Sequence, residues 1–232
     1  HVVAMDVQTL GWDELEAYRY TGELEPERTL TVSPELMRAA EEEWLALNRW
    51  RIEKAVLARK YFSWLAASDG MGLHASAVAY EGCAYVFTAD SGTGKSTHAH
   101  LWQQAFGTDR VEVLNDDKPA LREKDGRFYA CGSPWCGKER QETNLMVPLQ
   151  GICLLAQGRE NRIERVEPKA AIVPILRQTL LPESTAEDTE RFMAMLERLV
   201  TTVPIYRLES TISENAARLA WTTMRPAGED EG

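Results

Sequence analysis

Several features that would point to a particular class of protein are missing from this sequence. No apolar run approaches the length of a membrane span, no signal-peptide pattern opens the chain, and no segment repeats. Basic residues form no cluster, and 26 Lys and Arg stand against 36 Asp and Glu, which gives a net charge of −10. We therefore expect a cytoplasmic protein that has neither a membrane nor a nucleic acid as its partner.

Cysteine is scarce and shows no metal-binding spacing. The four cysteines are Cys83, Cys131, Cys136 and Cys153, and no two of them form a C-x-x-C pair. Cys83 and Cys153 lie in apolar runs, where a thiol behaves as a small hydrophobic side chain. We expect four reduced thiols, as in the cytosol, rather than a zinc site or a disulfide.

What the sequence does contain is an ordinary soluble composition and one strong motif. The chain has 232 residues, of which 44% are hydrophobic and 27% charged, enough for one large domain or one domain with a small appendage. Residues 84–87 predict a buried strand, residues 90–94 a glycine-rich turn, and residues 95–106 a helix. A strand, a glycine loop, Lys-Ser and a helix together form the arrangement of a phosphate-binding loop, rather than an ordinary turn between a strand and a helix.

The residues of this loop suit the phosphates of ATP and a Mg²⁺ ion. Glycines let successive backbone N–H groups point at an anion, and the helix N-terminus adds a partial positive charge. Lys95 can reach the β- and γ-phosphates, and the Ser96 hydroxyl can bind Mg²⁺. Ala89 stands where the motif has glycine, which is tolerable if its φ is negative. The expected nucleotide-binding residues are Ser91, Gly92, Thr93, Gly94, Lys95, Ser96 and Thr97.

Two adjacent carboxylates, Asp116 and Asp117, follow a predicted strand about twenty residues beyond the loop lysine. Phosphoryl transfer needs one carboxylate to hold Mg²⁺ and can use a neighbour to accept the proton of the attacking hydroxyl. Successive residues of a strand point in opposite directions, so both can face the nucleotide only at an irregular strand end. The alternative is a solvated turn before Pro119.

Four further residues are candidates with a structural alternative each. His74 lies in the strand expected beside the one that feeds the loop, where it either bonds a carboxylate or phosphate of the site or is structural. Lys138 and Arg140 follow a glycine-rich turn, and either neutralise phosphoryl charge or are simply exposed. Trp135 either stacks on adenine or packs in the protein.

Hydrophobic periodicity predicts the remaining elements. Strands are expected at 2–5, 28–32, 73–80, 83–88, 111–114, 120–122, 127–131, 150–156 and 204–208, with 162–166 as a partner of 150–156. Helices are expected at 34–47, 51–67, 95–106, 170–181, 184–202 and 213–221. Ser33 is the expected N-cap of the first helix, Ser184 and Glu187 form an expected capping box, and residues 69–72 are expected to be a break.

Three segments, Leu73-His-Ala-Ser, the loop from Ala89 to Ser96, and Asn115-Asp-Asp, occur in this order and spacing. Together they resemble the C-terminal catalytic domain of bacterial HPr kinase/phosphorylase, whose fold is shared with phosphoenolpyruvate carboxykinases. The resemblance covers roughly residues 70–167. The segment from Gly132 to Lys138 is similar to a G-[ST]-P-W-x-G-K segment of divergent HPr-kinase-like proteins, some of which phosphorylate a serine of a precursor peptide.

The resemblance implies a fold and a division of the chain. The expected class is α/β (α+β), a P-loop domain of the HPr kinase/PEP carboxykinase type with mixed sheets. Residues 1–69 would form a small N-terminal α+β region, 70–224 the kinase-like domain and 225–232 a disordered tail. The N-terminal third does not look like that of the classical family, so neither HPr as a partner nor a hexamer is carried over, and a homo-oligomer stays open. The downstream Glu-x-Arg-Gly signature is missing, so phosphorylase activity is not implied either.

The resemblance also assigns roles to the candidate residues. Lys95 would bind the β- and γ-phosphates and Ser96 and Asp117 the Mg²⁺, while Asp116 would be the general base, supported by His74. The expected function is an ATP- and Mg²⁺-dependent kinase that phosphorylates a hydroxyl, such as a serine of a peptide or small protein, with Lys138 or Arg140 stabilising the transferred charge. A small-metabolite kinase and a non-catalytic nucleotide sensor or partner module are the alternatives.

Overall fold

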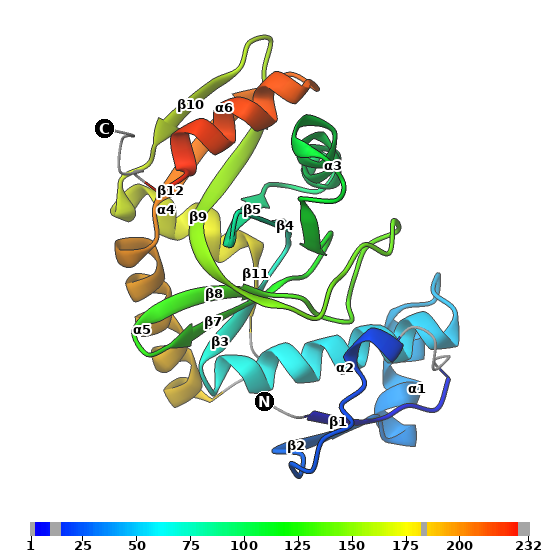
Figure 1. Cartoon of the computed structure of the whole chain (residues 1–232). Helices are drawn as coiled ribbons and strands as arrows, with labels where there is room; N and C mark the ends of the chain where they lie inside the picture. Colours follow the sequence, from blue (N-terminus) through cyan, green and yellow to red (C-terminus); the bar gives the residue numbers. More distant parts are fainter. Residues whose placement is uncertain (1–2, 10–14, 182–184, 227–232) are drawn as a thin grey trace.

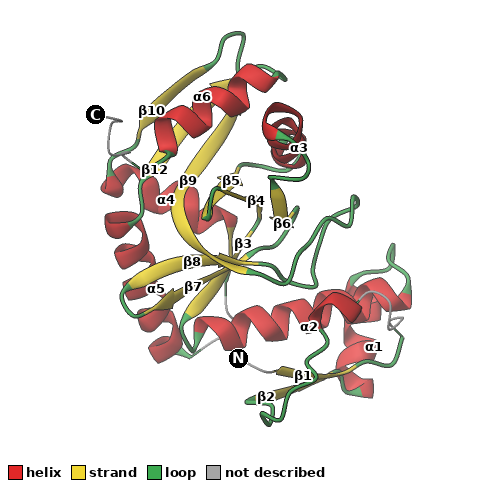
Figure 2. Ribbon diagram, viewed as in Figure 1, coloured by secondary structure: helices red, strands yellow, loops and turns green. Residues whose placement is uncertain are grey.

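The computed structural model of the chain describes residues 3–9, 15–181 and 185–226 (Figures 1 and 2). Its elements, with one 3-10 helix at Glu16–Tyr18, are β1 (Val3–Asp6), β2 (Arg28–Thr31), α1 (Pro34–Glu43), α2 (Arg49–Ala66), β3 (Gly70–Leu73), β4 (Ala75–Tyr80), β5 (Cys83–Thr88), α3 (Lys95–Phe106), β6 (Glu112–Asn115), β7 (Ala120–Lys124), β8 (Arg127–Cys131), β9 (Met146–Gln157), β10 (Arg162–Arg165), α4 (Pro168–Gln178), β11 (Thr179–Leu180), α5 (Ala186–Thr202), β12 (Ile205–Ser210) and α6 (Glu214–Met224). The expected class, a mixture of helices with mixed sheets, is confirmed at this level.

Within the described residues, ten strands form one mixed sheet in the order β11-β3-β7-β8-β9-β5-β4-β6, with β12 and β10 branching from β9. The long strand β9 makes the branch possible. Its first residues pair antiparallel with β8, its middle pairs parallel with β5, and its last residues pair parallel with β12. Figure 1 shows β9 as a long, curved strand through the middle of the sheet. This strand therefore holds together the strand that feeds the phosphate loop and the hairpin β7–β8.

Two tight turns fix the hairpins that the sequence predicts. Glu81 and Gly82 between β4 and β5 have φ values of 51° and 75°, and Asp125 and Gly126 between β7 and β8 have 52° and 74°. Two successive residues with positive φ form the turn type that matches the twist of a two-residue hairpin. The pairing of β4 with β5 and of β7 with β8 is antiparallel, as expected.

The sheet is covered on both faces because its central strands are apolar on both sides. In β5, Ala84 and Val86 belong to the core that packs under α4 and α5, whereas Tyr85 and Phe87 belong to the core under α3 and α6. Alternate residues of a strand point to opposite faces, so β5 is buried from Ala84 to Thr88. Figure 1 shows the two helix pairs on opposite sides of the strands. The loop before α3 thus starts from the buried end of this strand.

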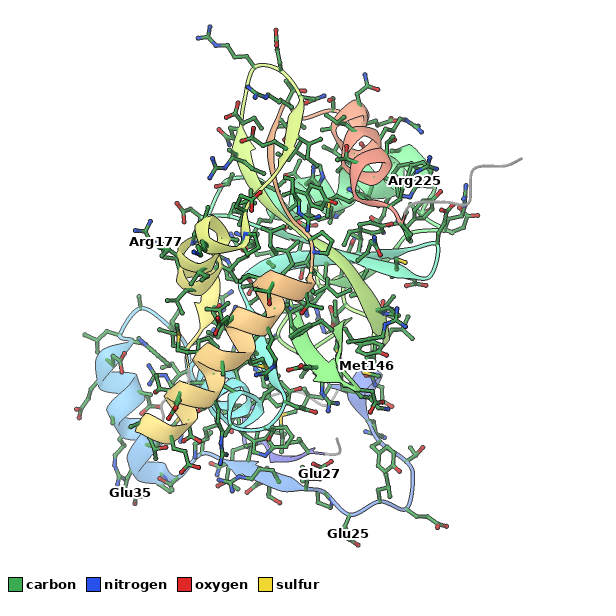
Figure 3. The ribbon with its side chains drawn as sticks, turned by 90° about the vertical axis from the view of Figure 1, so that its left-hand side faces the viewer. Glu25, Glu27, Glu35, Met146, Arg177 and Arg225 are labelled. Atoms are coloured by element: carbon green, nitrogen blue, oxygen red, sulfur yellow. The ribbon has the colours of Figure 1, made fainter. Side chains whose placement is uncertain are left out.

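The N-terminal region lies against the edge of this sheet. Strands β1 and β2 pair in parallel, and α2 packs on β3. A third core cluster joins Leu30 of β2 and Phe62 of α2 with Ala120 of β7 and Trp135. Figure 3 shows the acidic side chains of Glu25, Glu27 and Glu35 on the outer surface of this region. The division at residue 69 stays a prediction.

Several predicted elements differ in the structure. Residues 70–72, expected to belong to a break at 69–72, form β3 together with Leu73, because Gly70 and Gly72 pair with Arg122 and Ala120 of β7. The expected strand 73–80 is interrupted by a bend at His74. The predicted partner of β10 is wrong, since β10 pairs with β12 rather than with β9.

The helix ends also shift. The first helix stops at Glu43 rather than 47, although Ser33 does cap its start by accepting a bond from the N–H of Leu36. The helix expected at 170–181 ends at Gln178, and β11 follows. The capping box of α5 is made by Thr185 and Asp188 rather than by Ser184 and Glu187; Ser184 lies outside the described residues, as do residues 227–232 of the expected tail.

Candidate active site

The phosphate loop between β5 and α3 depends on two glycines. Gly92 has a φ of 81° and Gly94, the N-cap of α3, has 113°, a conformation that other residues rarely adopt. Ala89 is not among the residues with positive φ, which agrees with the expectation that alanine is tolerated there. The loop therefore has the backbone that lets successive N–H groups turn toward one point ahead of the helix N-terminus.

Lys95 lies over this loop. The residue is 7% exposed, and its Nζ donates to the carbonyl oxygens of Ala89 at 3.0 Å and Asp90 at 3.4 Å. Burial lowers the pKa of Lys95 from its usual value, while the charges of Asp117 and Asp90 act against this change. The Gln178 amide donates to Oδ1 of Asp90 at 2.8 Å and so ties the loop to the end of α4.

Asn115 shapes the turn that carries both candidate aspartates. Its Oδ1 accepts hydrogen bonds from the N–H groups of Asp117 at 2.8 Å and Lys118 at 2.6 Å, the geometry of an Asx turn. Its Nδ2 donates to the carbonyl oxygen of Ser133 at 2.8 Å. The strand β6 ends here, and the irregular end that both carboxylates require is present.

The backbone of Asp116 touches the phosphate loop directly. The hydroxyl of Ser96, in the first turn of α3, donates to the carbonyl oxygen of Asp116 at 3.2 Å, and the hydroxyl of Ser76 donates to the same oxygen at 3.3 Å. The phosphate loop and the turn that carries Asp116 are therefore joined through Ser96.

The carboxylate of Asp116 is buried and only partly satisfied. Oδ1 accepts from the N–H of Gly137 at 2.5 Å, whereas Oδ2 is buried with no hydrogen-bond partner among the described residues. Burial raises the pKa of Asp116 above its usual range, the bond from Gly137 opposes this, and the charges of Asp117 and Glu142 add to the increase. A carboxylate in this state is a stronger base than an exposed one.

Asp117 points to different neighbours. Its Oδ1 lies 3.4 Å from Nε2 of His74, and its Oδ2 contacts Nζ of Lys118. Burial and the charge of Lys95 lower the pKa of His74, while Asp117 and the Gln178 side chain oppose this decrease. The bend at His74 is fixed by its own backbone, which donates to Gln178 at 2.7 Å and accepts from the Thr88 hydroxyl at 2.8 Å.

Lys138 and Arg140 lie apart from the loop lysine. Both are exposed and line a cleft of about 1000 Å³ between α2 and the segment 135–140. Gly137 and Lys118 line the same cleft. Because the N–H of Gly137 bonds the Asp116 carboxylate, the cleft reaches the residue that covers this carboxylate. A second cleft of about 510 Å³ opens on the other side, where Gly92, Gly94 and Thr97 face β9 and the residues after β12.

Two residues near Asp116 carry more of the site than the sequence indicated. Gly137 supplies its hydrogen bond, and a side chain there would collide with the carboxylate. Glu142 pairs by its backbone with Asn115 and keeps a buried Oε2 without a partner among the described residues. The only sequence signal for Gly137 is its place in the Gly132–Lys138 segment. The only signal for Glu142 is that it is an acidic residue near that segment.

Packing decides between the two alternatives for Trp135 and gives His98 a structural role. Trp135 is 4% exposed, stacks on Tyr61 with ring centroids 4.8 Å apart, and donates from Nε1 to the Lys54 carbonyl at 2.9 Å. It is a core residue. His98 accepts a bond from Trp102, and burial lowers its pKa to about 4, so it is structural as well. All four cysteines are free thiols, as expected.

The oxygen donors beside the phosphate loop suit Mg²⁺ better than a metal ion that is held by protein side chains alone. In residues 3–9, 15–181 and 185–226 no group of three or more His, Cys, Asp or Glu side chains is placed to hold a metal ion. Mg²⁺ is usually held by one or two carboxylates, a hydroxyl and the substrate phosphates, with waters completing the octahedron. Ser96, Asp117 and the partnerless Oδ2 of Asp116 are oxygen donors of that kind beside the loop.

Comparison with known proteins gives a distant likeness in structure alone. No family model and no curated protein matches this chain. Among solved structures, the HPr(Ser) kinase/phosphatase from Coxiella burnetii is similar with a TM-score of 0.38 and 11% sequence identity, over 67% of this chain and 99% of that chain. Among the described helices, none is both long enough and apolar enough to cross a membrane.

Proposed function

We propose that this protein is an ATP- and Mg²⁺-dependent kinase that transfers the γ-phosphoryl group to a hydroxyl of a peptide or small protein. The observation that carries the proposal is the connection of a phosphate loop to a buried carboxylate. Ser96, in the helix after the loop, donates a hydrogen bond to the backbone of Asp116. Burial raises the pKa of the Asp116 carboxyl, and its Oδ2 has no hydrogen-bond partner among the described residues. A nucleotide-binding protein without chemistry needs the loop but has no use for such a base.

The loop and the smaller cleft suit the nucleotide. The N–H groups around Gly92 and Gly94 and the start of α3 favour phosphates, and Lys95 would pair with the β- and γ-phosphates. Thr97 belongs to both the loop helix and the lining of the 510 Å³ cleft, which would take the nucleoside. Ser96 and Asp117 would hold Mg²⁺, which neutralises charge on the transferred group when bound.

Asp116 is the base in this proposal. The acceptor hydroxyl gives its proton to Oδ2, its oxygen forms a bond to the γ-phosphorus, and the bond from that phosphorus to the β–γ bridging oxygen breaks, which releases ADP. His74 would orient Asp117. Lys138 or Arg140, on the acceptor side, would stabilise the charge of the transferred group. Because Oδ2 is covered by Gly137, the hydroxyl would approach from the cleft past this residue.

The test is transfer of label from γ-labelled ATP with Mg²⁺ to serine-containing peptides and to hydroxyl metabolites. Asp116→Asn should abolish transfer while ATP still binds, and Lys95→Ala should weaken ATP binding itself. Asp117→Asn should raise the Mg²⁺ concentration needed for half-maximal rate. Lys124→Ala, an exposed lysine on β7, is the control and should change none of these.

The possible results separate the alternatives. Transfer that survives Asp116→Asn but is lost in Asp117→Asn at any Mg²⁺ concentration would exchange the two roles. Label on metabolites alone would make the protein a small-metabolite kinase. Tight ATP binding with no transfer to any acceptor and no hydrolysis would leave a nucleotide sensor or partner module.

A further inference from the structure

The larger cleft lies mainly between two segments that are distant in the sequence, and Lys118 and residues 179–181 complete its lining. One wall is α2, from Trp50 to Phe62, with Trp44 beside it; the other is the segment from Trp135 to Arg140. The walls are fastened to each other, since the Trp135 indole donates to the Lys54 carbonyl at 2.9 Å and the Tyr18 hydroxyl donates to the Ser133 carbonyl at 2.8 Å. The N-terminal region therefore builds half of a cleft whose other half covers Asp116.

Charge in this cleft is of one sign. Its lining contains six basic side chains and no acidic one, in a chain whose net charge is −10. The basic residues are Arg51, Lys54, Arg59, Lys118, Lys138 and Arg140. Within the described part of the chain, no carboxylate lies within ion-pair distance of Arg51, Lys138 or Arg140. Such a concentration of positive charge in an acidic protein attracts and orients an anionic ligand.

Apolar surface accompanies the charge. Trp135 and Phe62 form a buried floor, with 4% and 1% exposure, and Trp44 and Trp50 stand at the cleft with the guanidinium groups of Arg59 and Arg51 each 5.4 Å from a ring centroid. A guanidinium held over a ring is already oriented before a ligand arrives, which lowers the entropy lost on binding. The cleft thus suits a ligand with negative charges and an apolar side chain.

The cleft is long enough for a chain segment. The wall from Trp50 to Phe62 spans twelve helical steps, or about 18 Å at ~1.5 Å per residue. An extended peptide advances about 3.3 Å per residue, so this wall matches five to six residues. A volume of about 1000 Å³ is also at the upper end of pockets for drug-sized molecules. A small anionic metabolite would fill only part of it.

We propose that this cleft is the docking site for an acidic segment of a peptide acceptor, with an apolar side chain seated among the tryptophans. The inference rests on the proposed kinase function and names its substrate class. Docking along α2 carries the bound chain to Gly137, the cover of Asp116, where a serine or threonine hydroxyl of the same peptide would meet the base. The N-terminal region is then the part of the chain that selects the acceptor.

The experiment measures docking without catalysis. The full chain carrying Asp116→Asn is titrated against three fluorescein-labelled eight-residue peptides, followed by fluorescence anisotropy at 20 and 150 mM salt. The first contains one Ser, one Phe and otherwise Glu; the second has Lys in place of Glu; the third has Ala in place of Phe. The Glu peptide should bind at least tenfold more tightly than the Lys peptide, should weaken as salt rises, and should lose affinity when Phe becomes Ala.

A charge reversal in the cleft provides the matched comparison. Arg51→Glu should weaken binding of the Glu peptide by about tenfold, as expected for reversing one exposed but oriented charge. Arg159→Glu, an equal change at an exposed arginine in the turn between β9 and β10, should alter it by less than twofold. That turn lies at the opposite end of the molecule from α2 (Figure 1). Thermal unfolding of both variants checks that each is folded.

Four results would overturn the docking proposal: equal affinity for the Glu and Lys peptides, no binding of the Glu peptide up to 1 mM, no response to Arg51→Glu, or full displacement of the Glu peptide by millimolar citrate, which would mark a small-anion pocket. Failure of the kinase function is a separate result. Binding of the Glu peptide by the unsubstituted chain with no label transferred from ATP would leave docking standing and remove the kinase. Transfer to a hydroxyl metabolite without binding of the Glu peptide would leave a kinase standing and remove the docking proposal.

Discussion

Replacing Gly137 with alanine should damage the chemistry of the site while sparing its nucleotide loop. The N–H of Gly137 donates to Oδ1 of Asp116 at 2.5 Å. A Cβ on Gly137 would lie 2.9 Å from Oδ2, 3.1 Å from Cγ and 3.2 Å from Oδ1 of the same carboxylate. Ordinary contacts begin at 3.4 Å, so the carboxylate would have to retreat by about half an ångström. The backbone of Gly137 does not have a positive φ, so this contact is the reason the residue must be glycine.

The size of the effect follows from that displacement. Misplacing a reacting group by about 1 Å can cost about 10²-fold in rate, so we expect kcat to fall by about ten- to a hundredfold. Packing an extra methyl into this buried contact should also lower the free energy of unfolding by about 1–3 kcal/mol. The affinity for ATP should stay within about twofold, because Gly137 contacts neither Lys95 nor the glycines of the loop.

The assay is steady-state ADP release with saturating acceptor, beside ATP affinity measured with a fluorescent analogue. Glu139→Ala, two residues further along the same segment and exposed, is the control and should leave kcat unchanged. An unchanged kcat in Gly137→Ala would refute Asp116 as the base. An equal loss of ATP affinity and kcat would show instead that the substitution disturbs the phosphate loop.

Three further predictions concern stability. Burial raises the pKa of Asp116, so the native protein retains a proton that the unfolded chain loses as pH rises above 3.8. The free energy of unfolding therefore falls as pH rises from 3.8 through the higher pKa of the native protein. Asp116→Asn should raise the free energy of unfolding at pH 8 by about 1 kcal/mol, measured by urea titration. Burial lowers the pKa of His98 from 6.5 to about 4, so the unfolded chain binds the proton first as pH falls below 6.5. Between pH 7 and pH 4.5 the unsubstituted chain should lose about 2.4 kcal/mol more than His98→Gln does, and equal losses would contradict the burial of a neutral imidazole. Trp135→Ala should lower the free energy of unfolding by about 3–5 kcal/mol, because it empties the centre of the third core cluster, and a loss below about 1 kcal/mol would show that this indole does not join α2 to the sheet.

Local features of the sequence predicted the elements that the structure shows most closely. The hairpin turns at Glu81-Gly82 and Asp125-Gly126 are set by residues that accept positive φ, and the structure has positive φ at all four. The loop from Ala89 to Ser96 is similarly local, since its glycines alone permit the backbone that it adopts. For such segments, the preference of each residue and the final conformation agree because no distant contact competes with them.

The failures have long-range causes. Residues 69–72 contain two glycines and are expected to be a break, yet residues 70–72 pair with β7. Gly72 is required because a Cβ there would lie 2.3 Å from the ring of Phe62. The partner of β10 is β12, which follows 40 residues later, and no local pattern distinguishes it from the nearer β9. The cover of Asp116 by Gly137 and the cleft along α2 likewise arise from segments that meet only in the folded chain.

The aspartate turn explains why two adjacent carboxylates can serve two different tasks. In a regular strand, Asp116 and Asp117 would face opposite sides of the sheet, and one of them would be lost in a core. Asn115 prevents this by accepting both following N–H groups, which turns the chain at the end of β6. Asp117 then lies beside His74 on the loop side, and Asp116 lies under Gly137 on the cleft side. Because the two carboxylates are separated by a single peptide unit, a nucleotide in the loop and a hydroxyl from the cleft would meet at this turn. The choice of acceptor can therefore vary with the cleft along α2 while the loop and its lysine stay the same.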